Sequence, residues 1–281
     1  MAAKPVKAYK NLEFLNSPEA RLLRIMAEYL EPRVRFHKEG VEDTIVFFGS
    51  ARVVDREQAQ QELNRWKKLC EEDPSEENLH RKAIAEKRLE LSRYYEDART
   101  LSRMLTEWSL NLHNTQRRFL IASGGGPGIM EAANRGAAEV PGGRSVGLNI
   151  SIPMEQNCNP YITEELNFEF HYFFMRKFWF VYLAKALVIF PGGFGTMDEL
   201  WEVLTLVQTQ KVRKRMPVVL YGEEYWKSVI NFDVLVENLM INREDLNLIY
   251  FANSPEEAFE YLTRRLSELF LTDTESAREP T

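Results

Sequence analysis

The sequence predicts a Rossmann-like three-layer α/β fold, in which helices cover both faces of a parallel sheet. Short apolar runs rich in β-branched residues alternate with helical patterns along the 281 residues, as a parallel sheet with crossover helices requires. Two of these runs lead into glycine-rich turns, at residues 124–128 and 192–195, and a helical pattern follows each turn. No internal repeat is evident, so we expect one main domain with extensions.

Composition limits the kinds of partner. The formal net charge of −6 argues against a general nucleic-acid binder, because a phosphate backbone calls for clustered Lys and Arg. Cys70 and Cys158 are far apart and lack CxxC spacing, so we expect no disulfide framework, no zinc site and a reducing, cytoplasmic setting. The N-terminus shows no apolar secretion signal. The apolar tract at 172–190 contains three cations and is therefore a poor membrane span.

Residues 1–43 are expected to form a helical extension of a main domain at 44–271. Ser17-Pro18 offers an N-cap and a first helical residue, and we expect the helix to end at Pro32. Its apolar stripe consists of Leu22, Leu23, Met26 and Leu30. We expect this stripe to pack on the main domain, with dimer contacts as the alternative.

The first strand is predicted at residues 44–48, before a Gly49-Ser50 turn. A mixed-charge segment follows, and because a crossover helix needs only about a dozen residues, residues 55–97 are expected to be an insertion. This insertion is either a helical hairpin on the surface or a dimer arm. Between residues 91 and 112, apolar residues recur at intervals of three and four, which predicts an amphipathic helix that packs on the domain.

The second strand, at 119–123, leads into a Gly-Gly-Gly-Pro-Gly turn and a helix that is expected to end at Gly136. A dinucleotide site of the G-x-G-x-x-G type would need a third glycine at position 129, which is Ile. The support for a NAD site is correspondingly weak. Glu131 lies in the first helical turn, where the helix dipole favours a carboxylate.

A third strand is predicted at 144–150, and a polar loop follows it. Ligands of doubly wound sheets bind outside the carboxyl ends of the strands. Glu155 and Gln156 of this loop could therefore hold ribose hydroxyls. Ordinary solvation of a loop explains them too.

Residues 168–184 are predicted to form a helix that is apolar on all sides and is therefore buried. The helix carries Arg176 and Lys177, and a buried cation is costly unless an anion accompanies it. That partner could be Glu199, another structural carboxylate, or a substrate.

Residues 185–200 are predicted to be a strand, a Pro-Gly-Gly-x-Gly loop and a helix. The glycines let backbone N–H groups approach a ligand, and the helix N-terminus adds partial positive charge, so a phosphate would bind there. The stretch lacks the Lys-Ser/Thr of a P-loop. Thr196 and Glu199 could instead form an ordinary capping box. Thr205, on the same helix flank as Glu199 and Glu202, could reach a base or sugar.

Beyond this helix the alternation of strand and helix continues. The last helix begins at Ser254-Pro255, and the polar residues 272–281 are expected to be disordered. The intervening elements are predicted as a strand at 217–221, a helix at 225–240 and a strand at 248–252, with the last helix reaching about Leu271.

The pattern Pro-Gly-Gly-x-Gly-Thr-x-x-Glu at 191–199 resembles the signature of the LOG family. Members of that family are nucleoside 5′-monophosphate phosphoribohydrolases that were formerly labelled lysine decarboxylases. The Gly49-Ser50 turn, the Gly-Gly-Gly-Pro-Gly turn and the Arg176-Lys177 pair are also similar to that family, so the resemblance covers about residues 44–270 apart from the insertion. Many plant members carry Met-His-x-Arg-Lys where this chain has Phe-Phe-Met-Arg-Lys, which leaves the preferred base open.

The resemblance implies hydrolysis of the N-glycosidic bond of a nucleoside 5′-monophosphate, such as AMP or a cytokinin riboside monophosphate, to free base and ribose 5-phosphate. It implies Arg176 and Glu199 as the catalytic pair, because a carboxylate stabilises oxocarbenium character on the sugar. It further implies a homodimer, with no metal and no cofactor. The substrate-binding residues expected are Ser50, Gly124, Gly125, Glu155, Met175, Lys177, Gly192, Gly193, Gly195, Thr196 and Thr205.

Two other functions are compatible with these motifs. A nucleotide-binding regulatory protein would use the same site without turnover. A pyridoxal-phosphate decarboxylase, which the older family label suggests, would need a lysine for the Schiff base.

Overall fold

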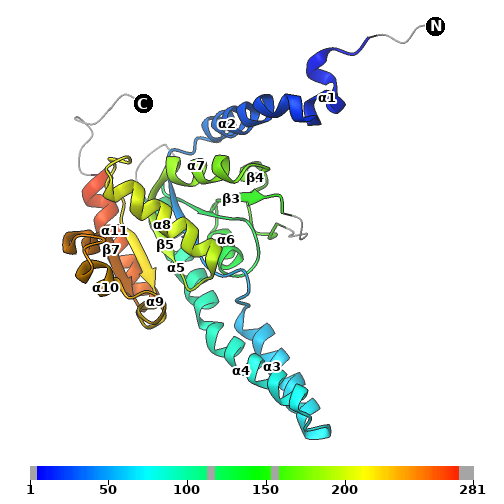
Figure 1. Cartoon of the computed structure of the whole chain (residues 1–281), viewed down its shortest axis with the longest axis vertical. Coiled ribbons are helices and arrows are strands. Elements are labelled where there is room, and N and C mark those ends of the chain that lie inside the picture. Colours follow the sequence, from blue (N-terminus) through cyan, green and yellow to red (C-terminus); the bar gives the residue numbers. More distant parts are fainter. Residues whose placement is uncertain (1–4, 113–117, 153–157, 272–281) are drawn as a thin grey trace.

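The sheet of this protein has seven strands in the order β4-β3-β2-β1-β5-β6-β7. The computed structural model describes residues 5–112, 118–152 and 158–271. Each pair of neighbouring strands is parallel, and helices cover both faces (Figure 1), so the predicted three-layer α/β fold is confirmed. The strands are β1 (Thr44–Phe48), β2 (Leu120–Ser123), β3 (Ser145–Ile150), β4 (Asn167–Phe170), β5 (Ala184–Ile189), β6 (Val218–Tyr221) and β7 (Ile249–Ala252).

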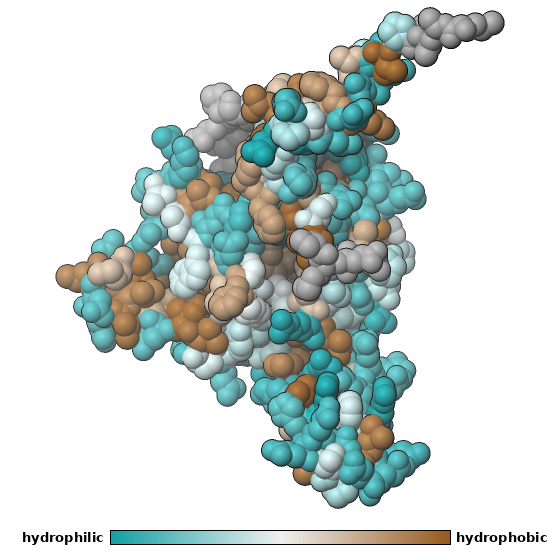
Figure 2. Space-filling model, turned by 45° about the vertical axis from the view of Figure 1, so that its right-hand side comes forward, coloured by the Kyte–Doolittle hydropathy of each residue, from teal (hydrophilic) through white to brown (hydrophobic). Residues whose placement is uncertain are grey.

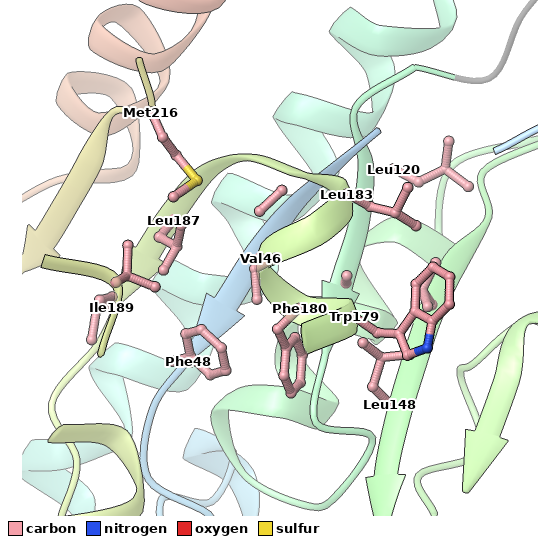
Figure 3. Packing of buried hydrophobic residues seen from close by; sticks show 14 of the residues in the cluster. Val46, Phe48, Leu120, Leu148, Trp179, Phe180, Leu183, Leu187, Ile189 and Met216 are labelled. Atoms are coloured by element: carbon pink, nitrogen blue, oxygen red, sulfur yellow. The ribbon is translucent and has the colours of Figure 1, made fainter. Parts of the chain in front are cut away.

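Two hydrophobic cores lie on opposite faces of the sheet. One core packs the sheet against α2 (Arg21–Lys38), α7 (Phe173–Leu183), α8 (Phe194–Gln208) and α9 (Glu223–Val229). The other packs it against α5 (Arg93–Leu110), α6 (Ile129–Ala138) and α11 (Pro255–Phe270). Figure 3 shows α7 meeting the sheet, where the ring of Phe180 lies 4.9 Å from that of Phe48 in β1.

The central strand β1 places three turns side by side. Strand order reverses between β1 and β5, and ligands of such sheets bind at this point, beyond the carboxyl ends of the strands. The amide of Ser50, after β1, donates to the carbonyl of Pro191, after β5, at 3.0 Å. The carbonyl of Ser50 accepts from the amide of Ile129, after β2, at 3.1 Å. Gly128 has φ +73°, and a Cβ there would overlap the backbone at Ser50, so the turns need a glycine to approach this closely.

The helix of the N-terminal extension continues past the point where the sequence predicted its end. Pro32 lies inside α2, which reaches Lys38. A proline lacks the N–H that would bond the carbonyl four residues earlier, here that of Glu28. The indole N–H of Trp179 donates to that carbonyl instead, at 2.9 Å. A residue of α7 thus satisfies the group that Pro32 leaves free.

The apolar stripe of α2 does not pack on the domain, so that prediction is wrong. The side of α2 that faces the domain carries Glu28, Pro32 and Phe36 instead. The four stripe residues are exposed, namely Leu22 (72%), Leu23 (48%), Met26 (55%) and Leu30 (48%). Three short helices precede α2 in the extension, namely η1 (Ala8–Lys10), α1 (Leu12–Asn16) and η2 (Pro18–Ala20).

The segment predicted as an insertion contains a helical hairpin that projects from the body (Figure 1). Its two helices are α3 (Arg56–Glu72) and α4 (Glu76–Leu91), which pack on each other. The hairpin surface is mainly hydrophilic (Figure 2), which fits the surface-hairpin alternative. The predicted amphipathic helix is α5, and its seam at Tyr94, Ala98, Leu101 and Leu105 is buried.

Several helix boundaries differ from the prediction. Residues 167–170 form strand β4, and α7 begins only at Phe173. This helix is not buried on all sides, because Phe173, Phe174, Phe178 and Tyr182 are exposed. The helix predicted at 225–240 is divided into α9 and α10 (Phe232–Glu237), because Asn231 caps the second part by accepting from the amide of Val234. Helix α6 runs through Gly136 to Ala138.

The strands predicted at 44–48, 119–123, 144–150, 217–221 and 248–252 differ from their predicted bounds by one residue or less, and α11 is capped by Ser254 as expected. Two further short helices are η3 (Glu164–Leu166) and η4 (Arg243–Leu248). Among the helices that the structure describes, none combines the length and apolar character needed to cross a membrane.

Candidate active site

The turn after β5 ends in a helix start whose amides are free. Helix α8 begins at Phe194 with Gly193 as its N-cap, so Thr196 is the third helical residue and the capping-box interpretation is wrong. The first bond into the helix runs from the amide of Met197 to the carbonyl of Gly193, at 3.0 Å. The amides of Phe194, Gly195 and Thr196 donate to no group in the described ranges. Three N–H groups and the helix dipole therefore point toward one place, as in an anion site.

Two contacts hold this turn in shape. The hydroxyl of Tyr225 donates to the carbonyl of Gly192 at 2.7 Å. The side chain of Thr196 folds over Gly192 so closely that a Cβ at position 192 would overlap it. Gly193 and Gly195 are exposed, and a Cβ at either would meet nothing within 4 Å. No described residue therefore blocks the approach to the free amides.

Arg176 of α7 is a largely buried cation whose side chain makes no hydrogen bond to any described residue. Its side chain is 15% exposed, and its Nη2 lies 3.7 Å from Oε1 of Glu199. Its Nε is buried without a partner in the described part of the chain. Burial lowers the pKa of Arg176, while Glu199 and Asp198 act in the opposite direction. A guanidinium in this state is suited to bind an anionic ligand.

Glu199 is the buried acid of the site. Its side chain is 5% exposed, and Nζ of Lys177 lies 3.6 Å away. Burial raises the pKa of Glu199 to about 7, although Lys177 and Arg176 oppose this change. A carboxyl group with a pKa near neutrality can accept and return a proton at neutral pH, as general acid–base catalysis requires.

Lys177 is a firmly protonated cation. It lies 2.8 Å from Asp198 and 2.7 Å from Glu202. Burial alone would lower the pKa of Lys177, but the hydrogen bonds to Asp198 and Glu202 raise it overall. The sequence left the anionic partner of these cations open between Glu199, another structural carboxylate and a substrate. In the structure Glu199 lies near both cations, and Asp198 and Glu202 also bind Lys177.

The turn after β2 is held in place mainly by contacts within the protein. Gly125 has φ +72°, and a Cβ there would overlap Asn149. Its carbonyl accepts from the backbone and side-chain amides of Asn159 at 2.8 and 3.1 Å. Asn159 is buried and also bonds Asn134. The polar loop residue Asn159 thus supports the glycine turn, a role that the sequence pattern did not indicate.

The predicted residues divide into three groups by position. Gly124 lies beside Arg176, since a Cβ at Gly124 would be 3.9 Å from Nη1 of that arginine. Thr205 is exposed and its hydroxyl donates to the carbonyl of Trp201 at 2.7 Å, about 9 Å along α8 from Glu199 at the usual rise per residue. Glu155 lies outside the described residues, as does Gln156. The residues that the fold gathers at one edge are Ser50, Gly124, Arg176, Lys177, Gly192, Gly193, Gly195, Thr196 and Glu199.

Met175 and Ser50, which were predicted to bind substrate, have structural contacts in this fold. Met175 is 7% exposed and belongs to the core beneath α7. The hydroxyl oxygen of Ser50 accepts from the amide of Arg52 at 3.1 Å, and its backbone joins the turns after β2 and β5. The amide of Phe194 was not predicted, because the sequence pattern placed the helix start at Thr196.

Comparison with known protein families gives a match, which covers the Pro-Gly-Gly-x-Gly-Thr-x-x-Glu motif. Residues 130–262 match a family model described as "Possible lysine decarboxylase". This LOG-like family match includes α7, the glycine turn after β5 and α8, and it leaves out the turns after β1 and β2. No curated protein matches the chain.

One solved structure similar to this chain is a molybdenum cofactor binding protein from the phototrophic bacterium Rippkaea orientalis. The two are 20% identical, with a TM-score of 0.43, over 62% of this chain and 88% of that chain. A likeness of this size carries no information about a ligand.

Proposed function

We propose that this protein hydrolyses the N-glycosidic bond of nucleoside 5′-monophosphates, such as AMP or a cytokinin riboside monophosphate, to free base and ribose 5-phosphate. The observation that carries the proposal is the buried pair of Arg176 and Glu199, 3.7 Å apart, beside the free amides at the start of α8. The "Possible lysine decarboxylase" match over 130–262 supports it at the level of the family.

The free amides fit the 5′-phosphate of the substrate. Backbone N–H groups at a helix start bind anions without a dedicated lysine. Open space at Gly193 and Gly195 lets a phosphate approach these groups closely. Binding energy at the phosphate then holds the sugar near Glu199, one turn further along α8.

The chemistry needs a carboxylate near the anomeric carbon. As the bond to the base breaks, its electron pair leaves with the base and positive charge develops on the sugar. Ionised Glu199 stabilises that charge and accepts the proton of the water whose oxygen attacks the anomeric carbon. The pKa of about 7 allows this group to be ionised for the attack and to release the proton afterwards. That proton balances the one that the departing base takes up from solvent.

Arg176 orients the acid and the substrate. Its buried Nε, which has no partner in the described ranges, leaves a donor for a substrate oxygen. Its attraction to Glu199 keeps a fraction of that carboxyl group ionised despite burial.

Neither Lys177 nor Lys214 fits the Schiff-base lysine of a pyridoxal-phosphate decarboxylase. Lys177, the lysine at the turns, is bound to two carboxylates and its pKa is raised, whereas a Schiff base needs a neutral amine. The pKa of Lys214 is lowered to about 7 by burial. Its amine, however, donates to the carbonyls of Val181 and Tyr182, before β5, at the opposite end of that strand from the glycine turn.

The test is a panel of nucleoside 5′-monophosphates with chromatographic detection of free base. Wild type is compared with Glu199→Gln, Arg176→Ala and the control Glu237→Gln, which changes an exposed glutamate on α10. We expect Glu199→Gln to lower kcat at least about 100-fold, and Glu237→Gln to leave it unchanged. Base release that persists undiminished in Glu199→Gln would refute the mechanism. Tight binding of AMP by wild type without base release would favour the regulatory alternative.

A further inference from the structure

One ammonium group is shared by three carboxylates at the start of α8. Nζ of Lys177 lies at hydrogen-bond distance from Glu202 (2.7 Å) and Asp198 (2.8 Å), but 3.6 Å from Glu199. The last distance is beyond that of a normal hydrogen bond. The lysine is therefore directed at the two carboxylates that flank the proposed catalytic acid.

The two flanking carboxylates differ in burial. The side chain of Asp198 is 60% exposed and that of Glu202 is 33% exposed. Water screens the more exposed partner more strongly, so Glu202 is the stronger holder of the lysine. Glu202 also lies three residues from Glu199, on the same side of the helix.

We propose that Glu202 is a positioning residue that holds Lys177 away from Glu199 and so leaves that carboxyl group free to take a proton from water. The catalytic part of this inference rests on the proposed hydrolysis of nucleoside monophosphates. Its electrostatic part concerns the folded protein alone.

The charged groups that face Glu199 come from two helices. Arg176 and Lys177 of α7 stabilise its ionised form, whereas Glu202 and Asp198 of α8 destabilise it. Without the charge of Glu202, only the more exposed Asp198 would compete with Glu199 for Lys177, so the lysine would move toward Glu199. A direct hydrogen bond to the ionised form lowers the pKa of a carboxyl group, and a less basic carboxylate is a weaker general base.

The direct test is a carboxyl NMR titration of protein labelled with ¹³C in its glutamate side chains. The signal of Glu199 is assigned by its loss in Glu199→Gln. We expect Glu202→Gln to lower the titration midpoint by about one pH unit and Glu237→Gln to leave it unchanged. Asp198→Asn, at an exposed position, should lower the midpoint by less, and it serves as the second variant if Glu202→Gln does not fold. An unchanged or raised midpoint in both variants would overturn the proposal.

A double-mutant cycle separates an effect through Lys177 from a direct effect of charge. Lys177→Met alone should raise the midpoint of Glu199. If Glu202 acts through the lysine, Glu202→Gln in the Lys177→Met background should produce well under half of its usual shift. Equal shifts in the two backgrounds would show that Glu202 acts only by its own charge, and the positioning role would be wrong.

The activity test uses the pH dependence of kcat/KM for base release from AMP. The acidic limb should move to lower pH in Glu202→Gln, in step with the NMR midpoint, and kcat above that limb should fall. Glu202→Asp keeps the charge and should restore the limb of the wild type. If wild type released no base from any nucleotide, the proposed function would fail, whereas an unmoved NMR midpoint in the variants would refute the positioning role.

Discussion

The hydroxyl of Tyr225 in α9 donates to the carbonyl oxygen of Gly192, 2.7 Å away, and so ties the turn after β5 to the following strand–helix unit. The tyrosine makes no other described hydrogen bond through its hydroxyl. The position of the free amides of α8 thus depends on a residue about thirty positions later in the chain.

Tyr225→Phe removes this contact and leaves the ring in place. Loss of one partly buried hydrogen bond costs about 1 kcal/mol, and we expect kcat/KM for the nucleotide to fall about fivefold, mainly through KM. Steady-state kinetics on AMP measure this change, with the melting temperature as a control for folding. A fall in kcat with KM unchanged would show that the turn does not serve phosphate binding.

Gly192→Ala and Gly193→Ala form a matched pair for the turn. A Cβ at 192 would overlap the side chain of Thr196, whereas a Cβ at 193 would meet nothing within 4 Å. We expect Gly192→Ala to lower the free energy of unfolding by about 1–3 kcal/mol and Gly193→Ala to leave it nearly unchanged. Urea denaturation compares the two. Equal losses in both variants would contradict the packing described here.

The pH dependence of stability reports on Glu199. Burial raises its pKa from an ordinary value of 4.5 to about 7, so the folded state binds this proton more tightly than the unfolded state does. The associated stability is fully present below pH 4.5 and is lost as pH rises through about 7. We therefore expect the wild type to lose unfolding free energy relative to Glu199→Gln between about pH 5 and pH 8. Urea denaturation across this range measures it, and parallel curves for the two proteins would contradict the assignment.

Glu28 joins the N-terminal extension to the helix that carries Arg176. Its carboxylate accepts from the amides of His171 and Tyr172, at 2.8 and 3.3 Å, just before α7. Glu28→Ala should cost about 1 kcal/mol, as the loss of a helix cap does, and should also lower kcat. Denaturation and base-release assays test both, with Arg33→Ala, at an exposed position of α2, as the control. A loss of stability without any change in kcat would separate the extension from the site.

The exposed apolar residues of α2 and α7 suggest where the expected homodimer would form. The ring of Tyr29 lies 5.5 Å from that of Phe178, so the exposed side chains of the two helices are neighbours. We expect light scattering to give the mass of a dimer, and Met26→Asp with Leu30→Asp to reduce it to that of a monomer. A monomeric wild type at all concentrations tested would refute the homodimer.

The sequence was most informative where burial alone determines the structure. All five residues of β1 are buried, and such a run reads as a strand of a parallel sheet without further information. The glycine turns after β2 and β5 were equally clear, because a strand led directly into each. The relation of these turns to Arg176 was predicted through family resemblance, not through periodicity.

The errors lie where distant residues decide the outcome. Pro32 is a signal for the end of a helix, but the helix continues. The indole N–H of Trp179 donates to the Glu28 carbonyl that the proline leaves without a donor. The helix at 194 starts without a side-chain cap, and Thr196 offered a plausible but incorrect one. In the sequence, Glu202 was noted only because it lies three residues from Glu199. The residues around it give no sign that Lys177 reaches it from another helix.

The position of β1 also bears on synthesis of the chain. Its two neighbours in the sheet are β2 and β5, and β5 leaves the ribosome only after the hairpin, three further strands and α7 have been made. Until then one edge of the central strand has no partner, and an open edge invites pairing with other chains. A nascent chain interrupted before β5 would therefore lack the glycine turn that follows this strand and would also be prone to aggregate.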